Sequence, residues 1–116
     1  WQFCSVDGEK KMSEPREYTV DEIREQFLAD IWRKVDYWEQ LPNKTKRERL
    51  SGLVHSVLAA LDGCALSVPG FLLIPNPHPS DKEFHEARGE NWYPSPSLEN
   101  DIGGDLHGLW YKVRKE

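Results

Sequence analysis

The chain has 116 residues and a formal net charge of −5, with 38% hydrophobic, 30% charged and 11% aromatic residues. This length and composition fit one soluble domain able to bury a core, and the aromatic content argues against intrinsic disorder. The negative charge disfavours a nucleic-acid partner, and prolines interrupt the longest uncharged run, residues 63–80, which excludes a membrane span there. Two cysteines are too few for a disulfide framework and no signal-peptide pattern is present, so we expect a cytoplasmic protein.

Residues 1–18 are expected to form an N-terminal extension of a single globular domain that covers residues 19–116. The single methionine, Met12, is followed by Ser13-Glu14-Pro15, which has the character of a natural beginning. The prediction therefore leaves open whether residues 1–11 belong to the native domain.

The segment Thr19–Gln40 has the pattern of an amphipathic helix. Thr19 and Glu22 have the spacing of a capping box at its start, and Pro42 prevents the helix from continuing. Apolar residues recur along one face at helical spacing. This face consists of Val20, Ile23, Phe27, Ile31, Val35 and Trp38, widened by Leu28 and Trp32.

A second helix is predicted over Thr45–Asp62, where Thr45 and Glu48 form another capping box and Gly63 suits a left-handed cap. Its apolar stripe, which we expect to be buried, consists of Leu50, Leu53, Val54, Val57, Leu58 and Leu61. Its opposite face is small and consists of Gly52, Ser56, Ala59 and Ala60. We therefore expect a central helix that is covered on both sides, and the short link predicts an antiparallel pair with the first helix.

The chain after Gly63 changes character. The apolar run Phe71–Ile74 predicts a short buried strand, to which Asn91–Tyr93 could add, although the nearby prolines leave few backbone donors for a sheet. A short surface helix is expected from a capping box at Ser80, and a last helix over Ile102–Val113. The predicted fold class is α+β and mainly α: an antiparallel helix pair and a C-terminal helix with a small extended or β layer.

Three glycines, Gly103, Gly104 and Gly108, weaken the predicted last helix, because glycine is a poor helix former. Gly104 and Gly108 are four residues apart, on the side opposite the leucines. We interpret this spacing as close approach of another backbone. The neighbour is either the small face of the second helix or a second copy of the chain.

No catalytic or cofactor motif is present, and no catalytic residue, cofactor or bound metal is predicted. The densest polar group contains His78, Asp81 and His85, which are metal-ligand residue types, but their spacing matches no zinc or iron signature. His107 is a further acid–base candidate, although it does not share a face with the acidic residues beside it. The basic cluster is interpreted as a solvated helix entrance and consists of Lys44, Lys46, Arg47 and Arg49.

Aromatic residues give the clearest functional signal. Trp92 and Tyr93 follow a polar loop, and Trp110 lies off the apolar line of the last helix, so these residues either extend the core or anchor a protein partner. The leading hypothesis is a non-enzymatic protein-interaction module, with self-association left open. The alternative is a small metal-dependent or acid–base enzyme that uses the segment of His78, Asp81 and His85, and a nucleic-acid binder is the weakest hypothesis.

Overall fold

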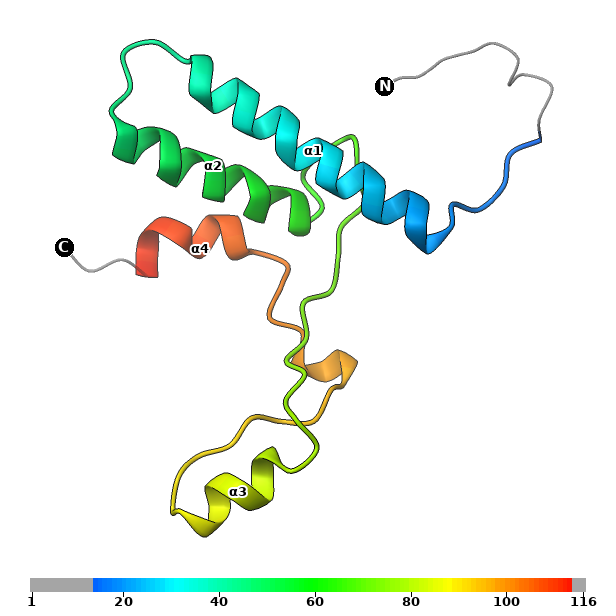
Figure 1. Cartoon of the computed structure of the whole chain (residues 1–116), viewed down its shortest axis with the longest axis vertical. Coiled ribbons are helices and arrows are strands. Elements are labelled where there is room, and N and C mark those ends of the chain that lie inside the picture. The colour runs from blue at the N-terminus through cyan, green and yellow to red at the C-terminus, as the bar shows by residue number, and fades with distance from the viewer. Residues whose placement is uncertain (1–13, 114–116) are drawn as a thin grey trace.

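The computed structural model describes residues 14–113, and this part of the chain is helical without any strand. The elements are α1 (Val20–Gln40), α2 (Lys46–Leu61), α3 (Asp81–Ala87), the 3₁₀ helix η2 (Leu98–Asn100) and α4 (Leu106–Val113). In Figure 1, α1, α2 and α4 lie side by side, and residues 71–105 form an arm that ends at α3. The radius of gyration, 19.0 Å, exceeds the value of about 13 Å expected for a compact domain of this length. The fold is therefore an open layer of helices.

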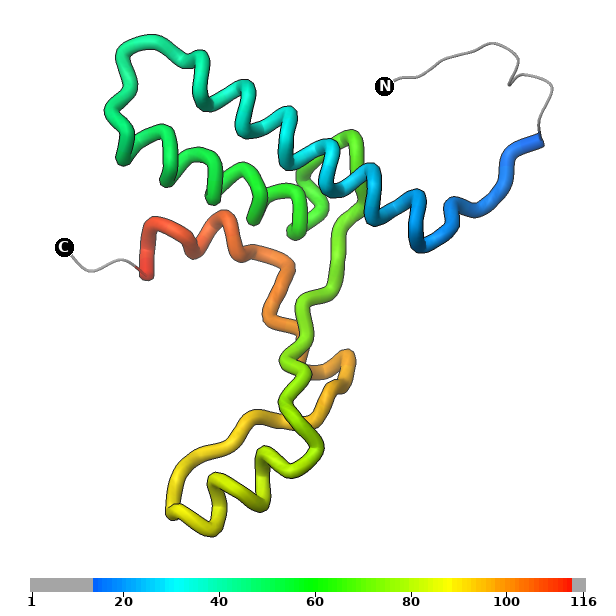
Figure 2. Tube along the Cα trace, in the orientation of Figure 1, coloured from blue at the N-terminus to red at the C-terminus, as the bar shows by residue number. Residues whose placement is uncertain are grey.

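The two long helices begin where the sequence predicts. Thr19 accepts a hydrogen bond from the backbone of Glu22, whose carboxylate accepts one from the Thr19 backbone, and Thr45 and Glu48 repeat this arrangement in α2. Each capping box satisfies backbone donors that the first helical turn leaves unpaired. The predicted antiparallel pair of α1 and α2 is thus confirmed (Figure 2).

The contact between α1 and α2 uses the small face of α2. Gly52 and Ala60 are its buried residues, and the indole ring of Trp38 from α1 lies directly over Gly52. The Trp38 Nε1 donates a hydrogen bond to the Ser56 Oγ, 2.8 Å away, so the ring is also held by a polar contact. A glycine at this position lets the indole approach the α2 backbone more closely than any side chain would.

The predicted burial of the apolar stripe of α2 is wrong for two of its members. Leu50 is 65% exposed and Val54 39% exposed, while Leu53, Val57, Leu58 and Leu61 are half-buried. Helical spacing identifies residues that share a face, but it does not say whether another element covers that face. In the described part of the chain, Leu50 and Val54 of this stripe are therefore left exposed.

The last helix packs on α2 alone, so α2 is central but the three helices form a layer in place of the expected three-helix core. This helix begins at Leu106 and not at Ile102. Gly104 has a φ of 107°, which is incompatible with a right-handed helix, and Ile102 is exposed. The predicted length of the helix is therefore corrected from Ile102–Val113 to Leu106–Val113.

The predicted β layer is also wrong, and hydrogen bonding explains why. Residues 71–74 belong to no helix or strand, although the Leu73 carbonyl accepts a bond from the Ile102 backbone N–H, as in a sheet. The Leu73 N–H, however, donates to the Asp101 carboxylate, 2.8 Å away. A side chain therefore takes the place of the second backbone–backbone hydrogen bond that a β-ladder needs. The residues 91–93 are likewise outside any strand.

The link between α2 and the arm is held against α1 by a buried carboxylate. The Asp30 side chain accepts a hydrogen bond from the Ser67 hydroxyl at 2.6 Å and pairs with Lys34 at 2.8 Å. Val68, beside this contact, is one of the few buried apolar residues of the described chain.

The predicted capping box at Ser80 is absent, since the Ser80 side chain makes no cap hydrogen bond. None of the described helices has the length and apolar content needed to cross a bilayer.

Candidate functional site

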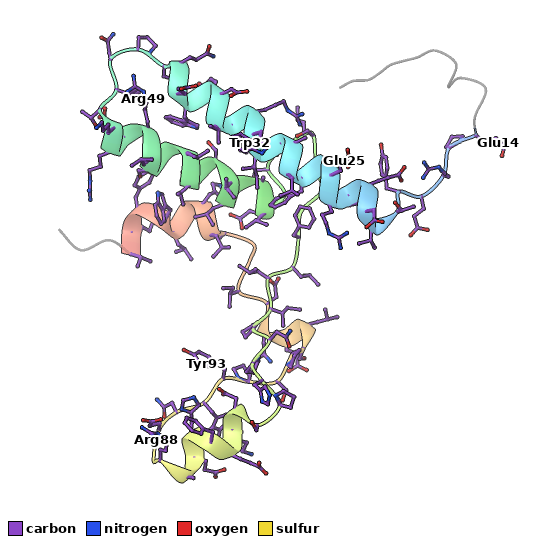
Figure 3. The ribbon with its side chains drawn as sticks, in the orientation of Figure 1. Glu14, Glu25, Trp32, Arg49, Arg88 and Tyr93 are labelled. Atoms are coloured by element: carbon purple, nitrogen blue, oxygen red, sulfur yellow. The ribbon has the colours of Figure 1, made fainter. Side chains whose placement is uncertain are left out.

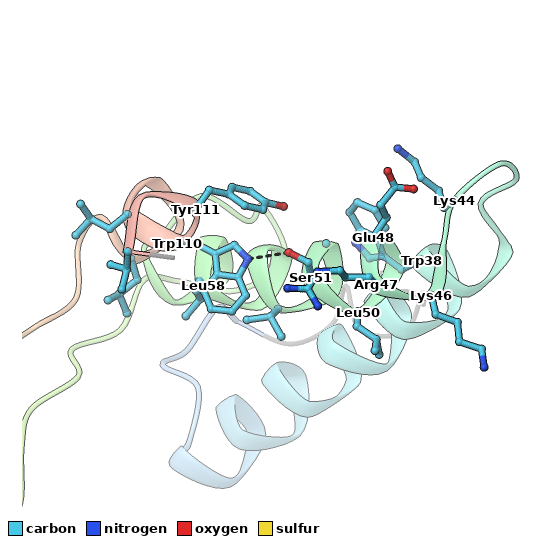
Figure 4. A pocket seen from close by; sticks show the side chains of 15 residues that line it. Trp38, Lys44, Lys46, Arg47, Glu48, Leu50, Ser51, Leu58, Trp110 and Tyr111 are labelled. Atoms are coloured by element: carbon cyan, nitrogen blue, oxygen red, sulfur yellow. Dashed lines mark hydrogen bonds between the residues drawn. The ribbon is translucent and has the colours of Figure 1, made fainter. Parts of the chain in front are cut away.

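An open groove of about 1310 Å³ runs along the N-terminal half of α2 beside the end of α4 (Figure 4). We call it the α2–α4 groove. Its apolar lining consists of Trp38, Leu50, Val54, Leu58, Leu106, Leu109, Trp110, Tyr111 and Val113. Its polar lining consists of Lys44, Lys46, Arg47, Glu48 and Ser51, and Gly52 also lines it. The groove thus has an apolar floor and a charged end at the start of α2.

The floor is built from pairs of apolar residues at helical spacing. Leu50 and Val54 are four residues apart on α2, and Leu109 and Val113 are four apart on α4. Residues at this spacing are neighbours on one helix face. All four are exposed in the described chain. Two adjacent helices therefore present apolar ridges to the same open space.

Hydrogen bonding and ring stacking position α4 along α2. The Trp110 Nε1 donates to the Ser51 Oγ at 3.2 Å, drawn as a dashed line in Figure 4. The Tyr111 ring stacks on the His55 ring, with 5.5 Å between the ring centroids. Ser51 and Ser56 of α2 thus each receive an indole N–H, one from α4 and one from α1. These contacts fix the α4 wall of the groove.

The start of α4 is capped by a residue from the end of α2. The Asp62 carboxylate, 1% exposed, accepts hydrogen bonds from the backbone N–H groups of Gly104 at 3.1 Å and His107 at 2.8 Å. The His107 Nδ1 lies 2.5 Å from the same carboxylate. Burial raises the pKa of Asp62, but the His107, Leu106 and Gly104 hydrogen bonds outweigh it and lower the pKa to about 2. Asp62 therefore acts as the N-cap of α4, although α4 starts only at Leu106, far along the chain.

Unpaired cations surround the charged end of the groove. Lys44, Lys46 and Arg47 are exposed and make no ion pair with any residue in the range 14–113. The fourth member of the basic cluster, Arg49, turns inward and donates to the Leu41 carbonyl at 2.7 Å. The carboxylate of Glu48 is occupied in the capping box. A chain that is acidic overall therefore has a locally basic rim at this groove.

The predicted polar group lies elsewhere, at the end of the arm. The His85 ring contacts Asp81 at 3.3 Å and Glu90 at 2.9 Å, while the His78 ring bonds to Ser80 in its own turn. His107, in α4, lies beside Asp62, and Figure 1 shows α4 at the opposite end of the arm from α3. The structure therefore does not gather the histidines around one cleft. Among residues 14–113, no group of three or more His, Cys, Asp or Glu residues is arranged to hold a metal ion.

The predicted aromatic residues divide between two places. Trp92 and Tyr93 are exposed on the arm, where Lys82 lies 5.4 Å from the centre of the Trp92 ring and the Tyr93 N–H donates to Asp81 at 3.0 Å. Figure 3 shows Tyr93 on the arm near Arg88, far from the groove. Of Trp92, Tyr93 and Trp110, only Trp110 lines the α2–α4 groove. The structure thus brings one predicted aromatic residue together with the apolar floor.

The two glycines of the C-terminal segment have no backbone packed against them within the described chain. A Cβ at Gly104 would meet nothing within 4 Å, and the three atoms nearest to one at Gly108 all belong to the side chain of Asp105. Inside the described chain, a backbone lies close to a glycine between Gly63 and Gly70, and a side chain, that of Trp38, lies close to Gly52. Whether a second copy approaches Gly104 or Gly108 remains a prediction.

The chain matches no protein-family model, no curated protein and no solved structure. Sequence reasoning missed Ser51, Asp62 and the Trp38–Gly52 contact. The small residues on one face of α2 were a signal for the Trp38–Gly52 contact. The Asp62 cap joins residues that are distant in sequence, and no local pattern identifies it.

Proposed function

We propose that this chain is a non-enzymatic protein-interaction module that binds an amphipathic segment of a protein in the α2–α4 groove. The observation that supports this proposal is the exposed apolar floor formed by Leu50, Val54, Leu109 and Val113. Contiguous exposed apolar surface is characteristic of interaction sites, because water disfavours it and a partner removes it from water.

The chemistry of the groove favours a helical segment as the ligand. Apolar ridges on two adjacent helices form the usual receptor for an amphipathic helix, whose anchors recur at three- and four-residue spacing. Trp110 and Tyr111 add aromatic side chains of the kind that dominate interface energies. The unpaired cations at one end would select a ligand with carboxylates beside its apolar face.

Site-specific photocrosslinking in the cells that produce the protein tests this proposal. A benzoylphenylalanine at position 50 is expected to give discrete adducts, and the same residue at position 66 none. Leu66 is the matched control, because it is an exposed leucine outside the groove. Leu109→Gln, in the part of the apolar floor that α4 forms, should weaken the adducts formed at position 50. Equal adducts at both positions, or none at either, would contradict the proposal.

A further inference from the structure

We infer that the ligand of the α2–α4 groove is the outer face of α1 from a second copy of this chain. This inference rests on the proposed function, whose site it uses. The partner follows from the charge and the apolar pattern of two surfaces that every copy possesses.

The outer face of α1 has the pattern of a groove-binding helix. Leu28 and Trp32 are 52% and 67% exposed although they are large and apolar, and they lie four residues apart. Carboxylates at helical spacing extend the same face in both directions. The complete face reads Asp21, Glu25, Leu28, Trp32, Asp36 and Glu39, with successive spacings of 4, 3, 4, 4 and 3 residues. Figure 3 labels Glu25 and Trp32 on α1.

The charges of the two surfaces are complementary. Asp21 pairs with Arg24, but Glu25, Asp36 and Glu39 are exposed and make no ion pair with the rest of residues 14–113. The unpaired cations of the groove rim, described above, are the opposite charges. Apolar residues then face apolar residues, and Asp36 and Glu39, at one end of the α1 face, meet the cations at the one charged end of the groove.

Each copy has one groove and one α1 outer face, so two copies can exchange them reciprocally. A reciprocal exchange gives a closed two-fold dimer, the commonest symmetric assembly of soluble proteins. It covers the apolar residues of both surfaces at once. Trp32 is the expected anchor, because tryptophan is enriched among residues that contribute most of the binding energy of an interface.

The test uses charge reversal and sedimentation velocity on the purified full chain. One variant reverses the groove rim by Lys44→Glu, Lys46→Glu and Arg47→Glu, and another reverses the α1 face by Glu25→Lys, Asp36→Lys and Glu39→Lys. A matched control reverses exposed acidic residues outside both surfaces by Glu83→Lys, Glu86→Lys and Glu99→Lys. Circular dichroism establishes that each variant keeps its helices.

The wild type and the control should sediment as dimers, and each reversed variant alone should weaken dimerisation by about 100-fold. An equimolar mixture of the two reversed variants should form a heterodimer, because the groove of each then meets an α1 face of opposite charge. A monomeric wild type at millimolar concentration, dimers that survive both reversals, or a mixture that stays monomeric would overturn the inference. Crosslinks from position 50 to another protein would still support the proposed function, so the two failures are distinguishable.

Discussion

The contact of Trp38 with Gly52 allows the packing of α1 on α2 to be tested by one methyl group. A Cβ at Gly52 would lie 2.7 Å from the Cε3 of Trp38 and closer to two further ring atoms. The indole is rigid, so the ring must move and lose its hydrogen bond to Ser56. Overpacking costs about 1–3 kcal/mol and the lost bond about 1 kcal/mol, whereas alanine in a helix gains about 1 kcal/mol over glycine. Gly52→Ala should therefore reduce the free energy of unfolding by about 1–3 kcal/mol.

Urea unfolding followed by circular dichroism measures this change, and tryptophan emission should shift to the red as Trp38 becomes exposed. Gly108→Ala is the matched control. It also lies within a helix, but the atoms nearest to its new methyl group belong to the carboxylate of Asp105, which can rotate away. That variant should be stabilised by up to about 1 kcal/mol. If Gly52→Ala were stabilised to the same extent, α1 would not pack on α2 through Gly52.

Further predictions concern the start of α4 and the arm. The pKa of Asp62 is about 2 in the folded chain and near 3.8 when unfolded, so its contribution to stability is present above pH 4 and is lost as the pH falls toward 2. Asp62→Asn should cost about 1–2 kcal/mol at pH 7 and flatten this acid limb in urea titrations, and an unchanged limb would contradict the cap. Gly104→Ala should lower Tm, because its φ of 107° strains any side chain, and an unchanged Tm would exclude that backbone conformation. A chelator should leave Tm unchanged, whereas a drop reproduced by His85→Ala would indicate a bound metal.

Local sequence signals account for the parts of the fold that were predicted. The helix starts at Thr19 and Thr45 follow from side chain and backbone groups three residues apart, and Gly63 has the expected positive φ of 90°. Such interactions require nothing from the rest of the chain. The same reasoning failed at residues 71–74, because a side chain distant in sequence, Asp101, takes a backbone donor that a sheet would need.

The groove could be predicted only in part. The apolar stripe of α2 was evident, but its periodicity fits a buried core and an open binding face equally well. The decisive information is which face α1 occupies, and that depends on the fit of Trp38 over Gly52. Trp110 was recognised as a candidate because it lies off the apolar line, whereas Ser51 gave no signal until its indole partner was located.

We propose above all that Leu50 belongs to an open binding face and not to the core of the folded chain. The most direct test is the free energy of unfolding of Leu50→Gln, measured at a protein concentration where light scattering gives the monomer mass. Glutamine keeps the helix propensity of leucine, so only burial is tested. The structure, with Leu50 65% exposed, predicts a change within about 0.5 kcal/mol. A loss of about 2–5 kcal/mol would show that Leu50 is a core residue and would contradict the account.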